Sequence, residues 1–115
     1  MDVTDKDAPV AIVDEGYSDG AYSHQGWLNP GLDTFFHGDE IDEAAGRVEA
    51  TTTRVWDMSD LDAPVLVETF ANDTTSIDHN MYTEGRISYH SNYTSGLRIY
   101  SNGDAINGNL EEIAH

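Results

Sequence analysis

The chain has 115 residues, enough for one small domain, and its 22 acidic against 5 basic residues give a net charge of −17. Such a surface repels phosphate backbones, which argues against nucleic acid as a partner and disfavours anionic membranes. There is no cysteine, so disulfides and thiolate chemistry are excluded, and no apolar run approaches the ~20 residues of a membrane span.

The first 70 residues are expected to contain short strands joined by turns. Residues 1–20 are predicted to supply an outer strand of a preceding unit, and residues 21–70 a first unit. Within it, PVLVETF (64–70) alternates with the period of two that is typical of a strand. The Asp-rich DMSDLDAP (57–64) suits a connection. An acidic insertion at 39–52 is expected to form a surface loop, with a short helical turn as the alternative.

Residues 71–115 are predicted to hold a second unit and the start of the next. RISYHSNY (86–93) again alternates with period two and is rich in aromatic and β-branched residues. Turn-forming sequences follow at 94–96 and 101–104. The segment NGNLEEIAH (107–115) is expected to begin a further outer strand.

The two units are copies of one another. Four pairs of segments match in the same order, at offsets of 55, 55, 53 and 44 residues. They are DVTDKDAPVAIV (2–13) with DMSDLDAPVLVE (57–68), HQGW (24–27) with HNMY (79–82), FFHGDE (35–40) with SYHSNY (88–93), and TRVWDMSD (53–60) with LRIYSNGD (97–104). The offsets differ because the acidic insertion is present only in the first copy.

Four short strands repeated every ~45–50 residues indicate the blades of a β-propeller. The predicted fold is therefore all-β, with about two to two-and-a-half four-stranded antiparallel blades and an incomplete ring. One such unit cannot bury both faces of its sheet, and a closed ring needs at least four blades. We therefore expect either a piece of a longer protein or a chain that completes its ring by self-association.

Several phrases in order resemble the LVIVD-repeat, choice-of-anchor B family of secreted or surface β-propeller proteins. They are AYSHQGWL, GDEIDE, TRVWDMSDLDAPVLV, IDHNMY and SNYTSGLRI. The resemblance implies an exported protein, extracellular or on the cell surface and often tethered at its C-terminus, and it implies no established reaction. The chain departs from the family pattern where SNGDAINGN (101–109) replaces the expected Asp-Ser-Asp-Pro connector.

The repeated histidines form the candidate site. The innermost strand of a propeller blade lines the central channel, so residues at equivalent positions can converge there. This site could bind a divalent cation, Zn²⁺ or Ca²⁺, as a cofactor. The candidate ligands are His24, His37, Asp39, His79 and His90. The phrase GDEIDE adds the oxygen ligands Glu40, Asp42 and Glu43, which suit Ca²⁺. The competing and favoured interpretation is structural hydrogen bonding between blades, with Arg54, Arg98, Asn80 and Asn92 as further structural repeat positions.

No nucleophile elbow, zinc-protease motif or phosphate-binding glycine loop occurs in the chain. The leading expectation is therefore a non-enzymatic extracellular or cell-surface module that binds a protein or a glycan, for which an exposed Trp27 could stack on a sugar. The alternative is a divalent-metal-binding protein or a metal-dependent hydrolase with a His/Asp site in the propeller channel.

Overall fold

The computed structural model describes all of residues 1–115 and contains eight strands and two short 3₁₀ helices. The strands are β1 Ser23–Leu28, β2 Thr34–Asp39, β3 Thr52–Asp57, β4 Val65–Ala71, β5 Asn80–Glu84, β6 Ile87–Ser91, β7 Leu97–Asp104 and β8 Asn109–Ala114; the helices are η1 Tyr93–Ser95 and η2 Ala105–Asn107. The predicted all-β class is confirmed. No helix is long and apolar enough to cross a membrane.

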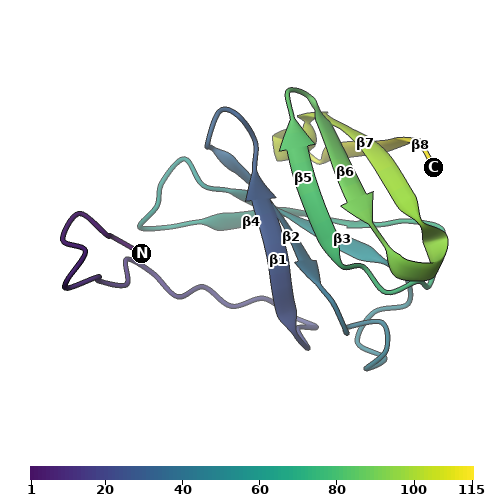
Figure 1. Cartoon of the computed structure of the whole chain (residues 1–115), viewed down its shortest axis with the longest axis horizontal. Coiled ribbons are helices and arrows are strands. Elements are labelled where there is room, and N and C mark those ends of the chain that lie inside the picture. The colour runs from purple at the N-terminus through teal and green to yellow at the C-terminus, as the bar shows by residue number, and fades with distance from the viewer.

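The strands form two four-stranded antiparallel sheets, each in chain order, β1-β2-β3-β4 and β5-β6-β7-β8 (Figure 1). The four-stranded antiparallel unit predicted from the repeat is thus confirmed for both copies. The first strands of the two sheets, β1 and β5, lie side by side, and the sheets do not close into a ring.

The register of the strands places equivalent residues of the repeat at equivalent positions. His37 of β2 lies opposite Arg54 of β3, and His90 of β6 lies opposite Arg98 of β7. Residues that are directly opposite on antiparallel strands point to the same face of the sheet. His37 and Arg54 therefore share one face of the first sheet, and His90 and Arg98 share the equivalent face of the second sheet.

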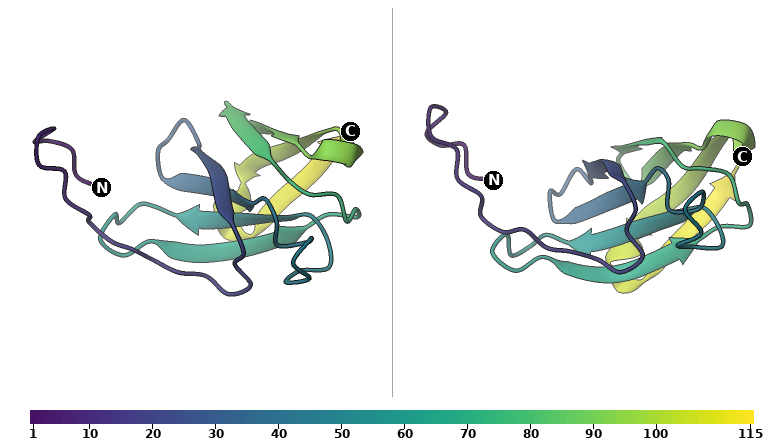
Figure 2. Two further views of the ribbon diagram at one scale, coloured as in Figure 1. Left: turned by 60° about the horizontal axis from the view of Figure 1, so that its bottom comes forward. Right: turned by 90° about the horizontal axis from the view of Figure 1, so that it is seen from below.

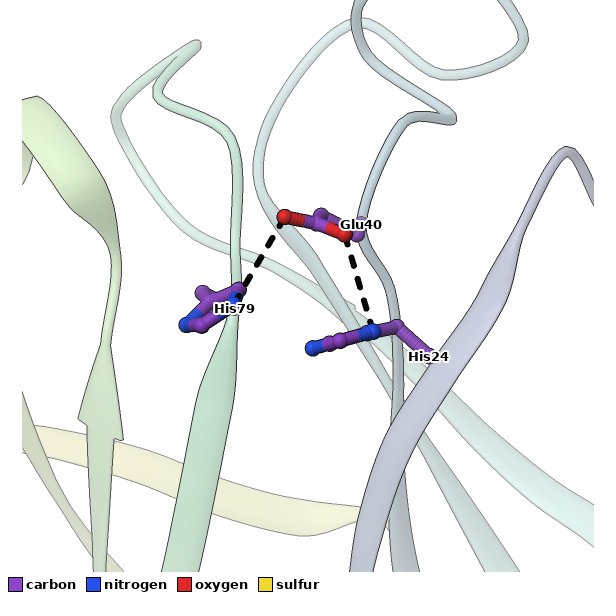
Figure 3. A group of neighbouring side chains, drawn as sticks. All are labelled: His24, Glu40 and His79. Carbon is purple, nitrogen blue, oxygen red and sulfur yellow. Dashed lines mark ion pairs between the residues drawn. The ribbon is translucent and has the colours of Figure 1, made fainter.

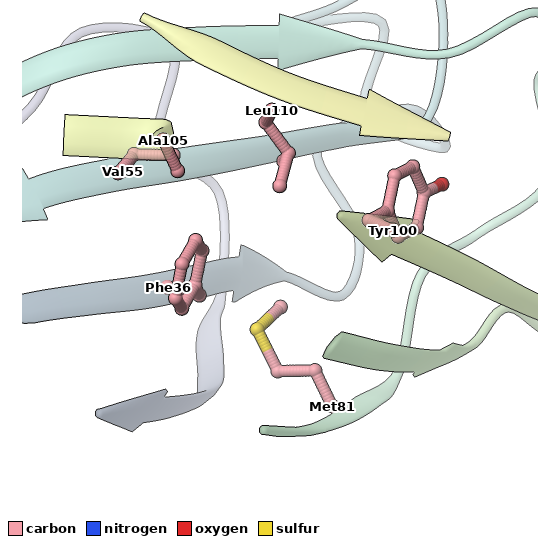
Figure 4. Close-up of a cluster of buried hydrophobic side chains, with 6 residues drawn as sticks. All are labelled: Phe36, Val55, Met81, Tyr100, Ala105 and Leu110. Atoms are coloured by element: carbon pink, nitrogen blue, oxygen red, sulfur yellow. The ribbon is translucent and has the colours of Figure 1, made fainter. Parts of the chain in front are cut away.

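A small hydrophobic core lies between the two sheets (Figure 4). Phe36 of β2 and Val55 of β3 are fully buried and come from the first sheet. Met81, Tyr100, Ala105 and Leu110 come from the second sheet and η2. More than half of the 23 buried residues are polar or charged, so hydrogen bonds and ion pairs fill much of the remaining interior.

Gln25 joins β1 to β5 through its side-chain amide. Its Nε2 donates to the carbonyl of Met81 at 3.1 Å, and its Oε1 accepts from the Met81 N–H at 3.0 Å. The amide therefore pairs with the β5 backbone as a neighbouring strand would. A third bond, from Thr83 Oγ1 to the carbonyl of Leu28 at 2.7 Å, closes the other end of this joint.

The two ends of the chain differ from the prediction. Residues 1–20 form no strand, and their only β-bridge pairs Asp2 with Val10. The beginning of the segment extends away from the sheets (Figure 2), whereas Tyr17 packs against His37 and Trp56. The C-terminal segment pairs with β7 as β8, with Tyr100 opposite Glu112, so it completes the second sheet and does not begin a third. A single strand sequence does not specify which neighbour it will pair with, because any free edge offers the same backbone groups.

The segment between β2 and β3 is a series of turns, and it does not lie wholly at the surface, because Asp42 and Thr51 are buried. The alternative helical turn is limited to one hydrogen bond of the α-helical type, from Ala45 N–H to the carbonyl of Ile41 at 2.8 Å. The loop carries Glu40, Asp42 and Glu43, and its position brings these acids to the junction of the two sheets.

Candidate metal centre

Two of the predicted ligands, His24 and His79, meet at the junction of the sheets (Figure 3). Their rings stack with centroids 4.7 Å apart and planes inclined by 23°. His24 stands at a β-bulge of β1, which turns its side chain out of the regular alternation, and His79 immediately precedes β5. Both side chains are partly exposed, so a solvent ion can reach them.

Glu40 is the third member of this group. Its Oε2 lies 3.5 Å from His24 Nδ1, and its Oε1 lies 3.7 Å from His79 Nε2. Both separations exceed the 2.7–3.2 Å of a good N–H···O hydrogen bond. Adjacent ligands around a tetrahedral Zn²⁺ with bonds of 2.0–2.2 Å lie ~3.4 Å apart, and each imidazole has one Glu40 oxygen near this distance, Oε2 for His24 and Oε1 for His79. One ligand atom of each residue lies within 4.8 Å of the others.

Tyr93 holds the carboxylate in this position. Its hydroxyl donates to Glu40 Oε1 at 2.5 Å, and this bond raises the pKa of Tyr93. Its ring lies 5.1 Å from that of His79. Tyr93 has φ 35°, in the left-handed region that a bulky residue seldom adopts, and the turn around η1 maintains it. A hydrogen-bonded outer partner of this kind orients a ligating carboxylate.

His37 and Asp39 lie on the other face of β2, against the N-terminal segment. Asp39 accepts from the hydroxyl of Tyr17 at 2.6 Å and from the N–H groups of Ala21 and Tyr22 at 2.7 and 2.6 Å. Burial alone would raise the pKa of Asp39, but these hydrogen bonds outweigh it and lower that pKa. Burial raises the pKa of Tyr17 to about 12, so the phenol remains a donor.

His37 makes a 2.8 Å hydrogen bond between its Nε2 and Ser23 Oγ. Burial, helped by the charge of Arg54, lowers the pKa of His37 to about 4, so the ring is neutral at physiological pH. Neither His37 nor Asp39 belongs to the group formed by His24, Glu40 and His79.

His90 is buried between the sheets, with its Nδ1 3.3 Å from Thr53 Oγ1 and its ring centroid 4.5 Å from that of Tyr100. Burial lowers the pKa of His90 to about 3. Asn92, two residues on, is also buried, and its side-chain atoms have no hydrogen-bond partner. The five predicted ligands therefore occupy three separate places.

The equivalent arginines make unlike contacts. Arg54 is buried, donates from NH2 to Asp42 Oδ2 at 2.8 Å and lies 4.6 Å above the ring of Tyr17. Arg98 donates from NH1 to Asp73 at 3.1 Å and to Glu112 at 2.8 Å. Asn80 is the first residue of β5, opposite Ser91.

A second group, Asp42, Glu43 and Asp78, lies in the interior beside this junction. Burial, with the nearby charge of Asp42, raises the pKa of Asp78 to about 7. Burial, with the nearby charges of Asp42 and Asp78, raises the pKa of Glu43 to about 8. The sequence pattern does not single out Asp78 as a ligand, although Asp78 directly precedes His79 in the repeated phrase.

Tyr93 is likewise absent from the predicted site residues, yet the repeat contains a signal for it. Aligning FFHGDE with SYHSNY makes Glu40 and Tyr93 equivalent, just as His24 and His79 are equivalent. Across the junction, His24 stacks on His79, and Tyr93 donates a hydrogen bond to Glu40. Glu40 also lies close to both histidines. The site is thus built from two repeated positions of neighbouring sheets.

No protein-family model matches the chain, and no curated protein is similar to it in sequence.

Proposed function

We propose that the chain is a binding module for a divalent transition-metal ion, with His24, Glu40 and His79 as its ligands. The observation that carries this proposal is the pair of 3.5 and 3.7 Å separations between one carboxylate and two repeat-related imidazoles. Two imidazole nitrogens and a carboxylate suit Zn²⁺, and such a three-ligand set leaves a coordination position for water. The same ligand set would serve the alternative function, metal-dependent hydrolysis by the bound water.

We further propose that the two sheets are neighbouring blades of a propeller related to the LVIVD-repeat family and exported to the cell surface. The packing of equivalent faces supports this arrangement. The first sheet covers His90 of the second, whereas the equivalent His37 is covered only by the N-terminal segment through Tyr17. A preceding blade would cover the His37 face of the first sheet as the first sheet covers His90. Such a blade would come from a longer protein or from self-association.

Thermal unfolding of EDTA-treated protein with added Zn²⁺ tests the metal proposal. At a free concentration 100 times the Kd, a single site stabilises the folded chain by about 2.7 kcal/mol. We expect His24→Asn and His79→Asn each to abolish the rise in Tm. Tyr93→Phe should weaken Zn²⁺ binding by about tenfold or more, because the carboxylate loses its orienting donor.

His115→Asn is the matched control, since His115 is another exposed histidine paired with a glutamate, Glu112, at 3.1 Å. This variant should respond to Zn²⁺ as the unaltered chain does. An equal Tm rise in all variants would instead indicate non-specific binding to the acidic surface, and the proposal would be wrong.

A second candidate function, glycan binding, is favoured by one exposed aromatic pair. Trp27 and Tyr82 are equivalent in the repeat, lie on β1 and β5 with ring centroids 4.8 Å apart, and are 43% and 50% exposed. Exposed aromatic faces of this kind can stack on sugar rings, and a protein partner is the other possible occupant.

We expect Trp27→Ala to remove calorimetric binding of cellohexaose or chitohexaose, with Leu61→Ala, an exposed apolar residue on the β3–β4 loop, as the control. No heat of binding from either sugar with the unaltered chain would argue against this glycan function.

A further inference from the structure

Asp78 is a buried carboxylate without a partner. Its side chain is 3% exposed, and neither carboxylate oxygen has a hydrogen-bond partner. It belongs to a different group from the metal centre, because its neighbours are Asp42 and Glu43 of the β2–β3 loop. An ionised carboxylate that is removed from water and left unpaired is strongly unfavourable, so this position calls for a counter-charge.

The charges around Asp78 leave a deficit of positive charge. Asp42 is fully buried and already binds Arg54, with Oδ2 2.8 Å from NH2. Glu43 is partly buried, and both of its carboxylate oxygens lack partners. When all three acids are ionised, the single guanidinium leaves two negative charges uncompensated, which one divalent cation would balance.

The spacing of the three acids suits a large cation with oxygen ligands. One oxygen from each residue lies within 4.8 Å of the other two. Three such points can all be reached from a common centre at about 2.8 Å or less, close to the 2.3–2.6 Å of Ca²⁺–oxygen bonds. Ca²⁺ accepts a flexible ligand geometry, which suits three acids that come from two separate segments, whereas Mg²⁺ demands near-ideal octahedral geometry. We propose that Asp42, Glu43 and Asp78 bind Ca²⁺ at the junction of the two sheets.

Gly38 of β2 provides the space that this arrangement needs. A Cβ atom at position 38 would lie 2.3 Å from Asp78 Oδ2 and 3.2 Å from the terminal methyl of Met81. Any other residue would therefore displace Asp78 from its place beside Asp42. The equivalent residue of the second copy is Ser91, so the glycine is particular to the strand that faces these acids.

The proposed ligands connect segments that are distant in sequence. Asp42 and Glu43 follow β2 of the first sheet, whereas Asp78 precedes β5 of the second. Ca²⁺ held by all three would fasten the two sheets together beside the Gln25 joint. Its loss should therefore lower the stability of the folded chain.

The test is calorimetric titration of the EDTA-treated full chain with CaCl₂, combined with thermal unfolding at constant ionic strength. We expect one Ca²⁺ per chain, a Tm rise that KCl of equal ionic strength does not reproduce, and a weaker response to MgCl₂. Asp78→Asn should raise the Ca²⁺ Kd at least tenfold. In EDTA, at a pH above the Asp78 pKa of about 7, the same variant should be no less stable than the unaltered chain, because it removes a buried unpaired charge.

Two controls separate this site from the surface charge and from the zinc proposal. Glu84→Gln removes one exposed acid from β5 and should leave the Ca²⁺ response intact, as should His24→Asn. If Asp78→Asn does not fold, Glu43→Gln takes its place with the same expected loss. A Ca²⁺ effect no larger than that of KCl, or an unchanged Ca²⁺ affinity in the acid-to-amide variant, would overturn the proposal.

Discussion

At the scale of single residues, burial decides the protonation of His90. The ring packs against Tyr100 and has only the 3.3 Å contact with Thr53 as a polar partner, so the charged form is disfavoured and the pKa falls to about 3. In the unfolded chain the same imidazole titrates near 6.5. Between these two values the unfolded state binds more protons than the folded state. The contribution of His90 to stability is therefore complete above pH 6.5 and is lost as the pH falls toward 3.

We predict that His90→Phe makes the free energy of unfolding less sensitive to acid. Lowering the pH from 7 to 5 should cost the unaltered chain about 2 kcal/mol more than the variant, at ~1.4 kcal/mol for each pH unit below 6.5. Urea unfolding of both proteins at the two pH values measures this difference, in which the effects of the other titrating groups cancel. Parallel pH profiles would mean that His90 has the same pKa in the folded and unfolded states, and the prediction would be wrong.

At the scale of single strands, alternation and the repeat predicted the elements well. The period-two segment 64–70 covers β4 except for its last residue, Ala71, and the segment 86–93 contains β6. The Asp-rich segment 57–64 spans the end of β3 and the β3–β4 connection. These features depend on neighbours in the sequence, where side-chain polarity reports which face is buried. The partner of β8 and the bulge at His24 were not predictable in this way, because both depend on hydrogen bonds to another strand.

The same distinction separates the ligands that were predicted from those that were not. Equivalence in the repeat placed His24 and His79 at matching positions, and they meet. Neighbouring residues on a strand point to opposite faces. His37 and Asp39 therefore point toward the N-terminal segment, whereas Glu40 points toward His24. Asp78 lies 36 residues from Asp42 in the sequence, and only the packing of two sheets brings them together.

At the scale of the whole molecule, the acidic surface should make stability depend on salt. A net charge of −17 is spread over a body of 42 × 31 × 23 Å, so like charges repel one another across most of its surface. The Debye length shortens from about 10 Å at 0.1 M salt to about 3 Å at 1 M, which removes most of this repulsion. The unfolded chain is more expanded and gains less from screening. Salt should therefore favour the folded state.

We predict that the Tm rises steadily between 0.05 and 1 M KCl in the presence of EDTA. The combined variant Asp62→Asn, Glu84→Gln and Glu111→Gln removes three exposed acids that accept no side-chain hydrogen bond. It should melt at a higher temperature than the unaltered chain at 0.05 M KCl, because it has less charge repulsion. At 1 M KCl the two proteins should melt at nearly the same temperature, because salt screens the repulsion that the substitutions would remove. Identical salt dependence in the two proteins would mean that KCl acts on apolar burial and not on charge repulsion.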